Sequence, residues 1–220
     1  MKKSIGAQVQ IIEYTPGVEK WNSITHGVGA VLSLIGTAAL VIKAQNGTRF
    51  FSALIYGLTL ITVYTASTVY HSLKKGDGKR IARIADHSAV PLLIAGTATP
   101  CTLITLYEIS HTRGLTVFFI GWAVALFGII SKVFFFEKLK ALTMAVYIVG
   151  GTGMLLSAVP VLDSIDKDGF YVLVFGGILY VIGAVLCGLG AKKQSLHVIF
   201  HLFVLAASAV HYYGIYHYVF

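Results

Sequence analysis

The residues best suited to chemistry are a histidine pair in the last apolar segment of the chain. His197 and His201 stand four residues apart in the stretch Leu-His-Val-Ile-Phe-His-Leu. On a helix this spacing puts both imidazoles on one face, about one turn apart. His71 and Asp86 add a third imidazole and a carboxylate, each inside apolar sequence. Polar groups in a membrane are costly unless they are paired or face a protected cavity, so we interpret these four residues as a functional site.

Three neutral imidazoles and a carboxylate are a donor set typical of zinc, which binds nitrogen and oxygen ligands tetrahedrally. We predict His71, His197 and His201 as nitrogen ligands of Zn²⁺, with Asp86 as a fourth ligand or as the group that holds and deprotonates a zinc-bound water. Zinc lowers the pKa of such a water to about 7, which gives a hydroxide nucleophile. Ser67 stands four residues before His71 on the same helix face and is a candidate to orient the water or donate to an oxyanion. Asp86 and Ser67 are therefore the predicted catalytic residues, acting on an ester or amide carbonyl presented from lipid.

Plainer interpretations of these residues also exist. Asp86 has Arg83 and Lys79 nearby in sequence and would form an ordinary ion pair with either. Ser67 would commonly hydrogen-bond the backbone of its own helix. Of the remaining histidines, His26 is expected to pack or cap and is also considered as a neighbour of the metal ligands, His87 is a minor candidate, and His111 is expected to be solvated. His211 and His217 are expected to form interfacial or interhelical hydrogen bonds.

The composition places the chain in the membrane class. Hydrophobic residues make up 56% of the sequence, charged residues only 12%, and the mean hydropathy is +0.80, whereas charged residues in soluble domains are near a quarter. The net charge of +8 does not indicate nucleic-acid binding, because the basic residues lie in short loops between apolar segments. Cys101 and Cys187 each lie in an apolar segment and are expected to be small buried side chains.

Seven apolar segments match the thickness of a bilayer core, so the predicted fold is an all-α bundle of seven transmembrane helices in a single domain over residues 1–220. Residues 1–23 are expected to be a tail, with an interfacial helix presenting Ile5, Val9 and Ile12 and ending at Pro16. The predicted spans are about 24–42, 50–71, 84–107, 115–134, 141–162, 170–190 and 196–219.

The basic residues predict the orientation of these spans in the cell membrane. Thirteen of the 17 lie in the tail and in the loops after spans 2, 4 and 6, and four lie on the other side. Because positive loops face the cytoplasm, the N-terminus is predicted inside and the C-terminus outside. Span 2 then ends at the cytoplasm with His71, while spans 3 and 7 begin there with Asp86 and the histidine pair. The four residues are thus expected at one depth, within two turns of the inner surface.

These segments resemble the bacterial hemolysin III family, part of the progestin and adiponectin receptor-like superfamily. The resemblance rests on Glu19–Gly27, Ser67–Ser72, Ile84–Ser88, Gly177–Ala184 and His197–His201. It implies a zinc near the cytoplasmic face, held by three histidines, with the aspartate engaged through water and Ser67 beside it. Relatives in the superfamily resemble ceramidases, which implies hydrolysis of lipid amides, while a role in membrane-lipid homeostasis is implied for bacterial members.

Three functions are compatible with these residues. The first is a zinc-dependent hydrolase of lipid amides or esters, with membrane lipids as partners and no nucleic acid. The second is a pore-forming haemolysin or channel, which would need a polar stripe through the whole membrane, whereas the polar groups here cluster at one end. The third is a receptor-like protein with a structural zinc. The sequence does not determine the oligomeric state.

Overall fold

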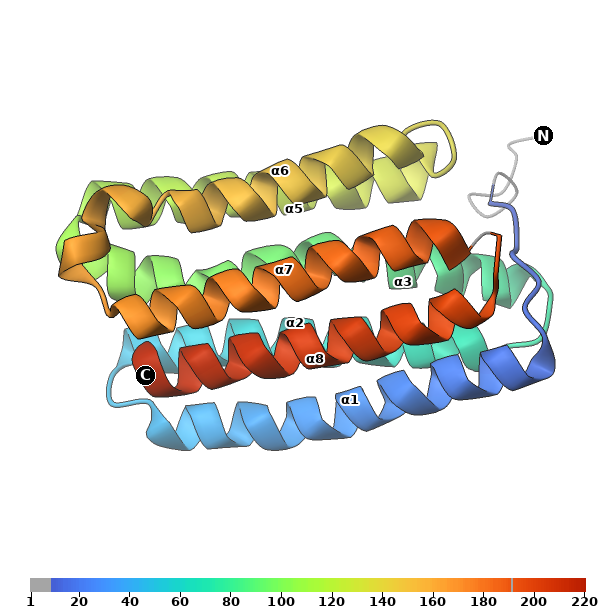
Figure 1. Ribbon diagram of the computed structural model, residues 1–220, viewed down its shortest axis with the longest axis horizontal. Helices are drawn as coiled ribbons and strands as arrows, with labels where there is room; N and C mark the ends of the chain where they lie inside the picture. The colour runs from blue at the N-terminus through green and yellow to red at the C-terminus, as the bar shows by residue number, and fades with distance from the viewer. Residues whose placement is uncertain (1–8, 191) are drawn as a thin grey trace.

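The computed structural model describes residues 9–190 and 192–220, and within them seven helices are long and apolar enough to cross a membrane. They lie side by side as one elongated bundle (Figure 1). The predicted all-α, seven-span fold is therefore confirmed. The helices are α1 (Pro16–Lys43), α2 (Gly47–Ser72), α3 (Asp77–Pro100), α5 (His111–Phe135), α6 (Lys140–Leu156), α7 (Lys167–Gly190) and α8 (Ser195–Tyr218), with shorter pieces η2 (Cys101–Leu106), α4 (Tyr107–Ile109) and η3 (Val159–Ser164).

The third span is longer than its apolar core, because helix continues through Asp77–Ile109 without a break. Its first two turns are rich in charge, so hydropathy alone does not detect them. Near its other end, Pro100 precedes the π-helical turn η2.

The first helix also begins earlier than predicted, at Pro16 rather than near residue 24. Proline is favoured at the first position of a helix, where no intrahelical N–H bond is lost. Pro16 therefore starts a helix instead of ending one. The expected interfacial helix is not found over residues 9–15, which are non-helical, and Ile5 lies outside the described residues. The earlier start places Glu19, Asn22 and His26 on α1.

Residues 9–15 fold back across the end of the bundle where α1, α3 and α8 begin. The Thr15 backbone N–H donates to Gln194 Oε1 at 2.9 Å, and Gln194 Nε2 donates to the Glu13 carbonyl at 2.9 Å. The Arg83 guanidinium donates to the Gln10 carbonyl. These bonds tie the segment to α3 and to the start of α8, directly beside the predicted site.

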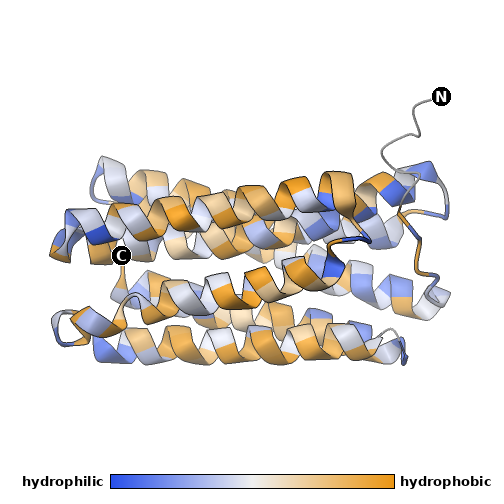
Figure 2. Cartoon of the chain, turned by 90° about the horizontal axis from the view of Figure 1, so that it is seen from above, coloured by the Kyte–Doolittle hydropathy of each residue, from blue (hydrophilic) through white to orange (hydrophobic). Residues whose placement is uncertain are grey.

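The outer surface of the bundle is apolar along its length and hydrophilic at both ends (Figure 2), as expected for helices in lipid. The interior, however, holds polar groups away from the predicted site. Tyr64 donates to Ser208 Oγ at 2.6 Å, and Tyr180 shares a 2.6 Å hydrogen bond with the same hydroxyl. Ser208 lies about 10 Å along α8 from His201. The expectation that polar groups cluster only at one end is therefore wrong.

Candidate metal centre

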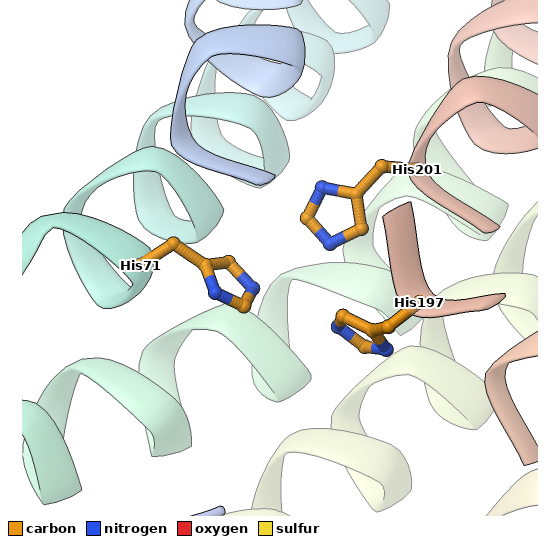
Figure 3. A group of neighbouring side chains, drawn as sticks. All are labelled: His71, His197 and His201. Atoms are coloured by element: carbon orange, nitrogen blue, oxygen red, sulfur yellow. The ribbon is translucent and has the colours of Figure 1, made fainter. Parts of the chain in front are cut away.

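The structure brings together the three histidines that the sequence singles out. His71 lies in the last turn of α2, and His197 and His201 lie in the first two turns of α8. One nitrogen from each ring lies within 4.8 Å of the other two, and the rings converge on one point between the helices (Figure 3). His71 and His201 are only 3% and 1% exposed, so water has little access to them.

Each of these rings has a buried nitrogen without a hydrogen-bond partner among the described residues. These atoms are His71 Nε2, His197 Nδ1 and His201 Nδ1. Buried polar atoms are nearly always hydrogen-bonded, so three such nitrogens in one cluster point to a missing partner. A neutral imidazole offers one lone pair, and nitrogen donors suit Zn²⁺ and related transition metals better than Mg²⁺ or Ca²⁺. The residues present therefore fit a zinc ion.

A carboxylate and an ammonium group lie behind His71. Glu19 Oε2 is 2.6 Å from His71 Nδ1, and Lys79 Nζ is 2.6 Å from Glu19 Oε1. Glu19 was not predicted as a site residue, because residues 1–23 were assigned to a tail. A signal was present, since Glu19, Asn22 and His26 have the spacing i, i+3, i+7 of one helix face.

His26 and Asn22 complete this face of α1. The His26 ring stacks on His201 with centroids 3.8 Å apart, and its edge meets Tyr64 at 5.1 Å. Neither ring nitrogen of His26 has a partner among the described residues. Asn22 is fully buried, with Nδ2 3.4 Å from His71 Nδ1. His26 thus packs against a member of the cluster but is not one of its three nitrogen donors.

Asp86 and Ser67 lie beside the cluster. The Asp86 carboxyl is close enough to the Ser67 hydroxyl and to the His71 ring to interact with both. Asp86 is not part of the group whose atoms lie within 4.8 Å of one another. Within residues 9–190 and 192–220 it forms no ion pair, because Arg83 pairs with Glu137 at 3.3 Å and Lys79 pairs with Glu19. The plainer interpretation of Asp86 as the partner of a nearby base is therefore wrong.

The other histidines have separate environments. His87 meets the Phe136 ring edge-on at 4.9 Å, and His111 stacks on Tyr107 at 4.3 Å. His211 Nε2 donates to the Leu173 carbonyl at 2.9 Å, which is the interhelical hydrogen bond expected for it. None of the three belongs to the cluster that the structure describes.

Tyr14 belongs to the segment of residues 9–15 and covers the cluster at the end of the bundle where α1, α3 and α8 begin. Its ring stacks on His197 with centroids 4.9 Å apart and lies 5.7 Å from the His71 ring. Burial raises the pKa of the Tyr14 phenol above its usual range, so the hydroxyl stays protonated. No spacing rule in the sequence links Tyr14 to histidines 57 and 183 residues away.

The fold and this cluster define a multi-pass membrane protein with a buried group of three histidines. The chain belongs to the family described as haemolysin-III related, whose model matches residues 15–212. The cell membrane is the usual location of such proteins.

Curated relatives agree with this assignment. The chain is 39% identical to Hemolysin-3 of Bacillus cereus over 202 residues, 90% of each chain, and 39% identical to the Hemolysin-3 homolog of Bacillus subtilis (strain 168) over 191 residues, 86% of this chain and 88% of the relative. It is also 29% identical to the human monocyte to macrophage differentiation factor over 204 residues, 90% of this chain and 83% of that protein. The human relative supports the wider receptor-like superfamily.

Proposed function

We propose that this protein is a zinc-dependent membrane hydrolase that cleaves acyl amides or esters of lipids. The observation that carries the proposal is the group of three buried ring nitrogens within 4.8 Å of one another. In this proposal His71, His197 and His201 hold the ion. When bound, zinc would lower the pKa of a water and polarise the substrate carbonyl.

The remaining chemistry belongs to Asp86 and Ser67. The Asp86 carboxylate accepts a proton from the attacking water as the new C–O bond forms at the carbonyl carbon. It then returns that proton to the leaving amine or alcohol as the C–N or C–O bond breaks, so that a fatty acid and the second product are released. The Ser67 hydroxyl, next to Asp86, holds the carboxylate in place or donates to the carbonyl oxygen. The helices are apolar on the outside of the bundle and polar at the histidine cluster, which suits a substrate with an apolar acyl chain and a polar amide or ester group.

A structural zinc is the second candidate, and one observation favours it. The three nitrogens come from α2 and α8, and α8 packs mainly against α7 and α1. A metal would therefore cross-link two helices whose backbones lie apart and which otherwise meet through side chains such as Tyr64 and Ser208. This function predicts the same metal binding but no product.

Metal content and hydrolysis together test the proposal. We expect about one zinc per chain in detergent-purified protein by mass spectrometry, and its loss in His197→Ala/His201→Ala. The matched control is His217→Ala, at the far end of α8, which should keep the zinc. With ceramide or a simple acyl ester as substrate, Asp86→Asn should keep zinc but release fatty acid at least about 100-fold more slowly.

Each result has a consequence. Purified wild-type protein without stoichiometric metal would refute the metalloenzyme, and ion flux through liposomes containing that protein would then favour a pore. If the protein binds zinc but hydrolyses no acyl lipid, the enzyme proposal is refuted and a structural role for zinc is favoured.

A further inference from the structure

We infer that Glu19 is a positioning residue for His71, selecting the ring nitrogen that faces the cluster, and that Lys79 in turn orients Glu19. The inference rests on the metal site proposed above and concerns how this chain prepares that site. The three side chains form a chain of contacts, Lys79 to Glu19 to His71, with both links at 2.6 Å.

The contact at Nδ1 determines which tautomer His71 adopts. A carboxylate oxygen only accepts hydrogen bonds, so Nδ1 must carry the hydrogen where it lies 2.6 Å from Glu19 Oε2. In the neutral ring the lone pair is then on Nε2. That atom is the buried His71 nitrogen without a partner, and the ring lies 5.5 Å and 5.0 Å, between centroids, from the rings of His197 and His201. A carboxylate behind a histidine ligand is a common arrangement for fixing the ring and raising its basicity.

Lys79 holds the other oxygen of the carboxylate. Its side chain is 5% exposed, donates to the Leu73 carbonyl at 3.0 Å and lies over the Tyr70 ring at 4.9 Å. Glu19 itself stands in the first turn of α1, where free backbone N–H groups stabilise a negative charge. Because both oxygens are engaged, Glu19 cannot turn away from His71 without breaking two charged contacts.

A second ion pair at the same end of the bundle provides the matched comparison. Glu13 pairs with Lys75, and both side chains are about two-thirds exposed, at 67% and 69%. Lys75 lowers the pKa of Glu13, as expected for an exposed pair. Among the described residues, Glu13 makes no side-chain contact with a histidine of the cluster. Neutralising Glu13 therefore removes the same charge as neutralising Glu19 but leaves the contacts among Lys79, Glu19 and His71 unchanged.

The substitution Glu19→Gln keeps the size of the side chain but changes which hydrogen bonds it can make with His71. Glutamine has one acceptor oxygen, and the Lys79 ammonium can only donate, so the amide oxygen should stay with Lys79. The amide NH₂ would then face His71 Nδ1 and favour the tautomer with hydrogen on Nε2, which blocks the lone pair that faces the cluster. Loss of such a supporting group weakens metal binding by about 10–100-fold.

The experiment is a zinc competition titration against a chromophoric chelator on purified full-length protein. We expect Glu19→Gln to raise the zinc Kd by about 10–100-fold and Glu13→Gln to leave it within about twofold.

Two further variants test the role of each contact. Glu19→Gln/Lys79→Met should recover part of the lost affinity, because the amide oxygen becomes free to accept from His71 Nδ1. Glu19→Asp, which keeps the charge but withdraws it from His71, should weaken binding by about 10-fold and provides a second variant if Glu19→Gln does not fold. In Co²⁺-loaded protein the visible absorption bands should shift in Glu19→Gln but not in Glu13→Gln.

Several outcomes would overturn the inference. An unchanged Kd and Co²⁺ spectrum in Glu19→Gln, even with lowered thermal stability of the metal-free protein, would show that Glu19 is only structural. Failure of Lys79→Met to restore binding in the double variant would overturn the role of Lys79. If the wild type binds no zinc, the inference fails together with the proposed function, whereas tight zinc binding by every variant removes this inference alone.

Discussion

Two glycines in α1 should respond in opposite ways to the same substitution. A Cβ added at Gly29 would lie 2.7 Å from Tyr64 Cδ1 and 2.9 Å from Leu205 Cδ1, which is closer than side chains pack. A Cβ added at Gly27 meets nothing nearer than Thr68 Cγ2 at 3.7 Å, an ordinary contact. Gly29 therefore lets α1 approach α2 and α8 one turn from His26, whereas Gly27 is not required for close packing.

The expected magnitudes follow from this difference. Alanine is favoured over glycine inside a helix by about 0.8–1 kcal/mol. Gly27→Ala should raise the free energy of unfolding by up to that amount. Gly29→Ala has the same gain, but crowding a packed interior typically costs about 1–3 kcal/mol. The difference in unfolding free energy between the two variants should therefore be about 1–3 kcal/mol, with Gly29→Ala the less stable.

Thermal unfolding in detergent measures this difference, with a thiol-reactive dye reporting exposure of the partly buried, free Cys101 and Cys187. Chelator should be present, so that metal binding does not add to stability. At about 2–4 °C per kcal/mol for a chain of this size, Gly29→Ala should melt about 2–12 °C below Gly27→Ala. Equal melting temperatures, or a higher one for Gly29→Ala, would refute the inferred close approach of α1.

Two further predictions concern the interior and the orientation. Tyr64→Phe should lower the free energy of unfolding by about 1 kcal/mol in chemical denaturation, because Ser208 keeps its bond to Tyr180 and the phenol loses one short bond to Ser208 and a long 3.4 Å contact with the Val204 carbonyl. A loss above about 3 kcal/mol would mean that the three side chains act as one network. In a variant without native cysteines, a membrane-impermeant maleimide should label Ser164→Cys on intact cells and Gly76→Cys only after permeabilisation. The reverse pattern would place the histidine cluster at the outer surface.

The sequence alone determined the spans and the histidine cluster's main members. A bilayer requires about 20 apolar residues per helix, and in lipid only helices or closed barrels satisfy the backbone, so composition and segment length predict seven helices directly. The pairing of His197 with His201 is equally local, because four residues make about one helical turn. Counting alternating spans orders residues by depth, which predicts His71 at the same level of the membrane as this pair.

Tertiary structure decided what surrounds the cluster. Glu19 and His71 are 52 residues apart, and Tyr14 reaches His197 only because residues 9–15 turn back over the bundle. Hydropathy could not assign either role, because it detects helix only where the residues are apolar, and α1 begins in a charged stretch at Pro16. The order of spans along the chain predicts how deep each residue lies in the membrane, but it does not predict how each helix is rotated about its axis relative to its neighbours. The packing of α1 against α2 and α8 fixes that rotation, and with it the charged residues that stand behind the histidines.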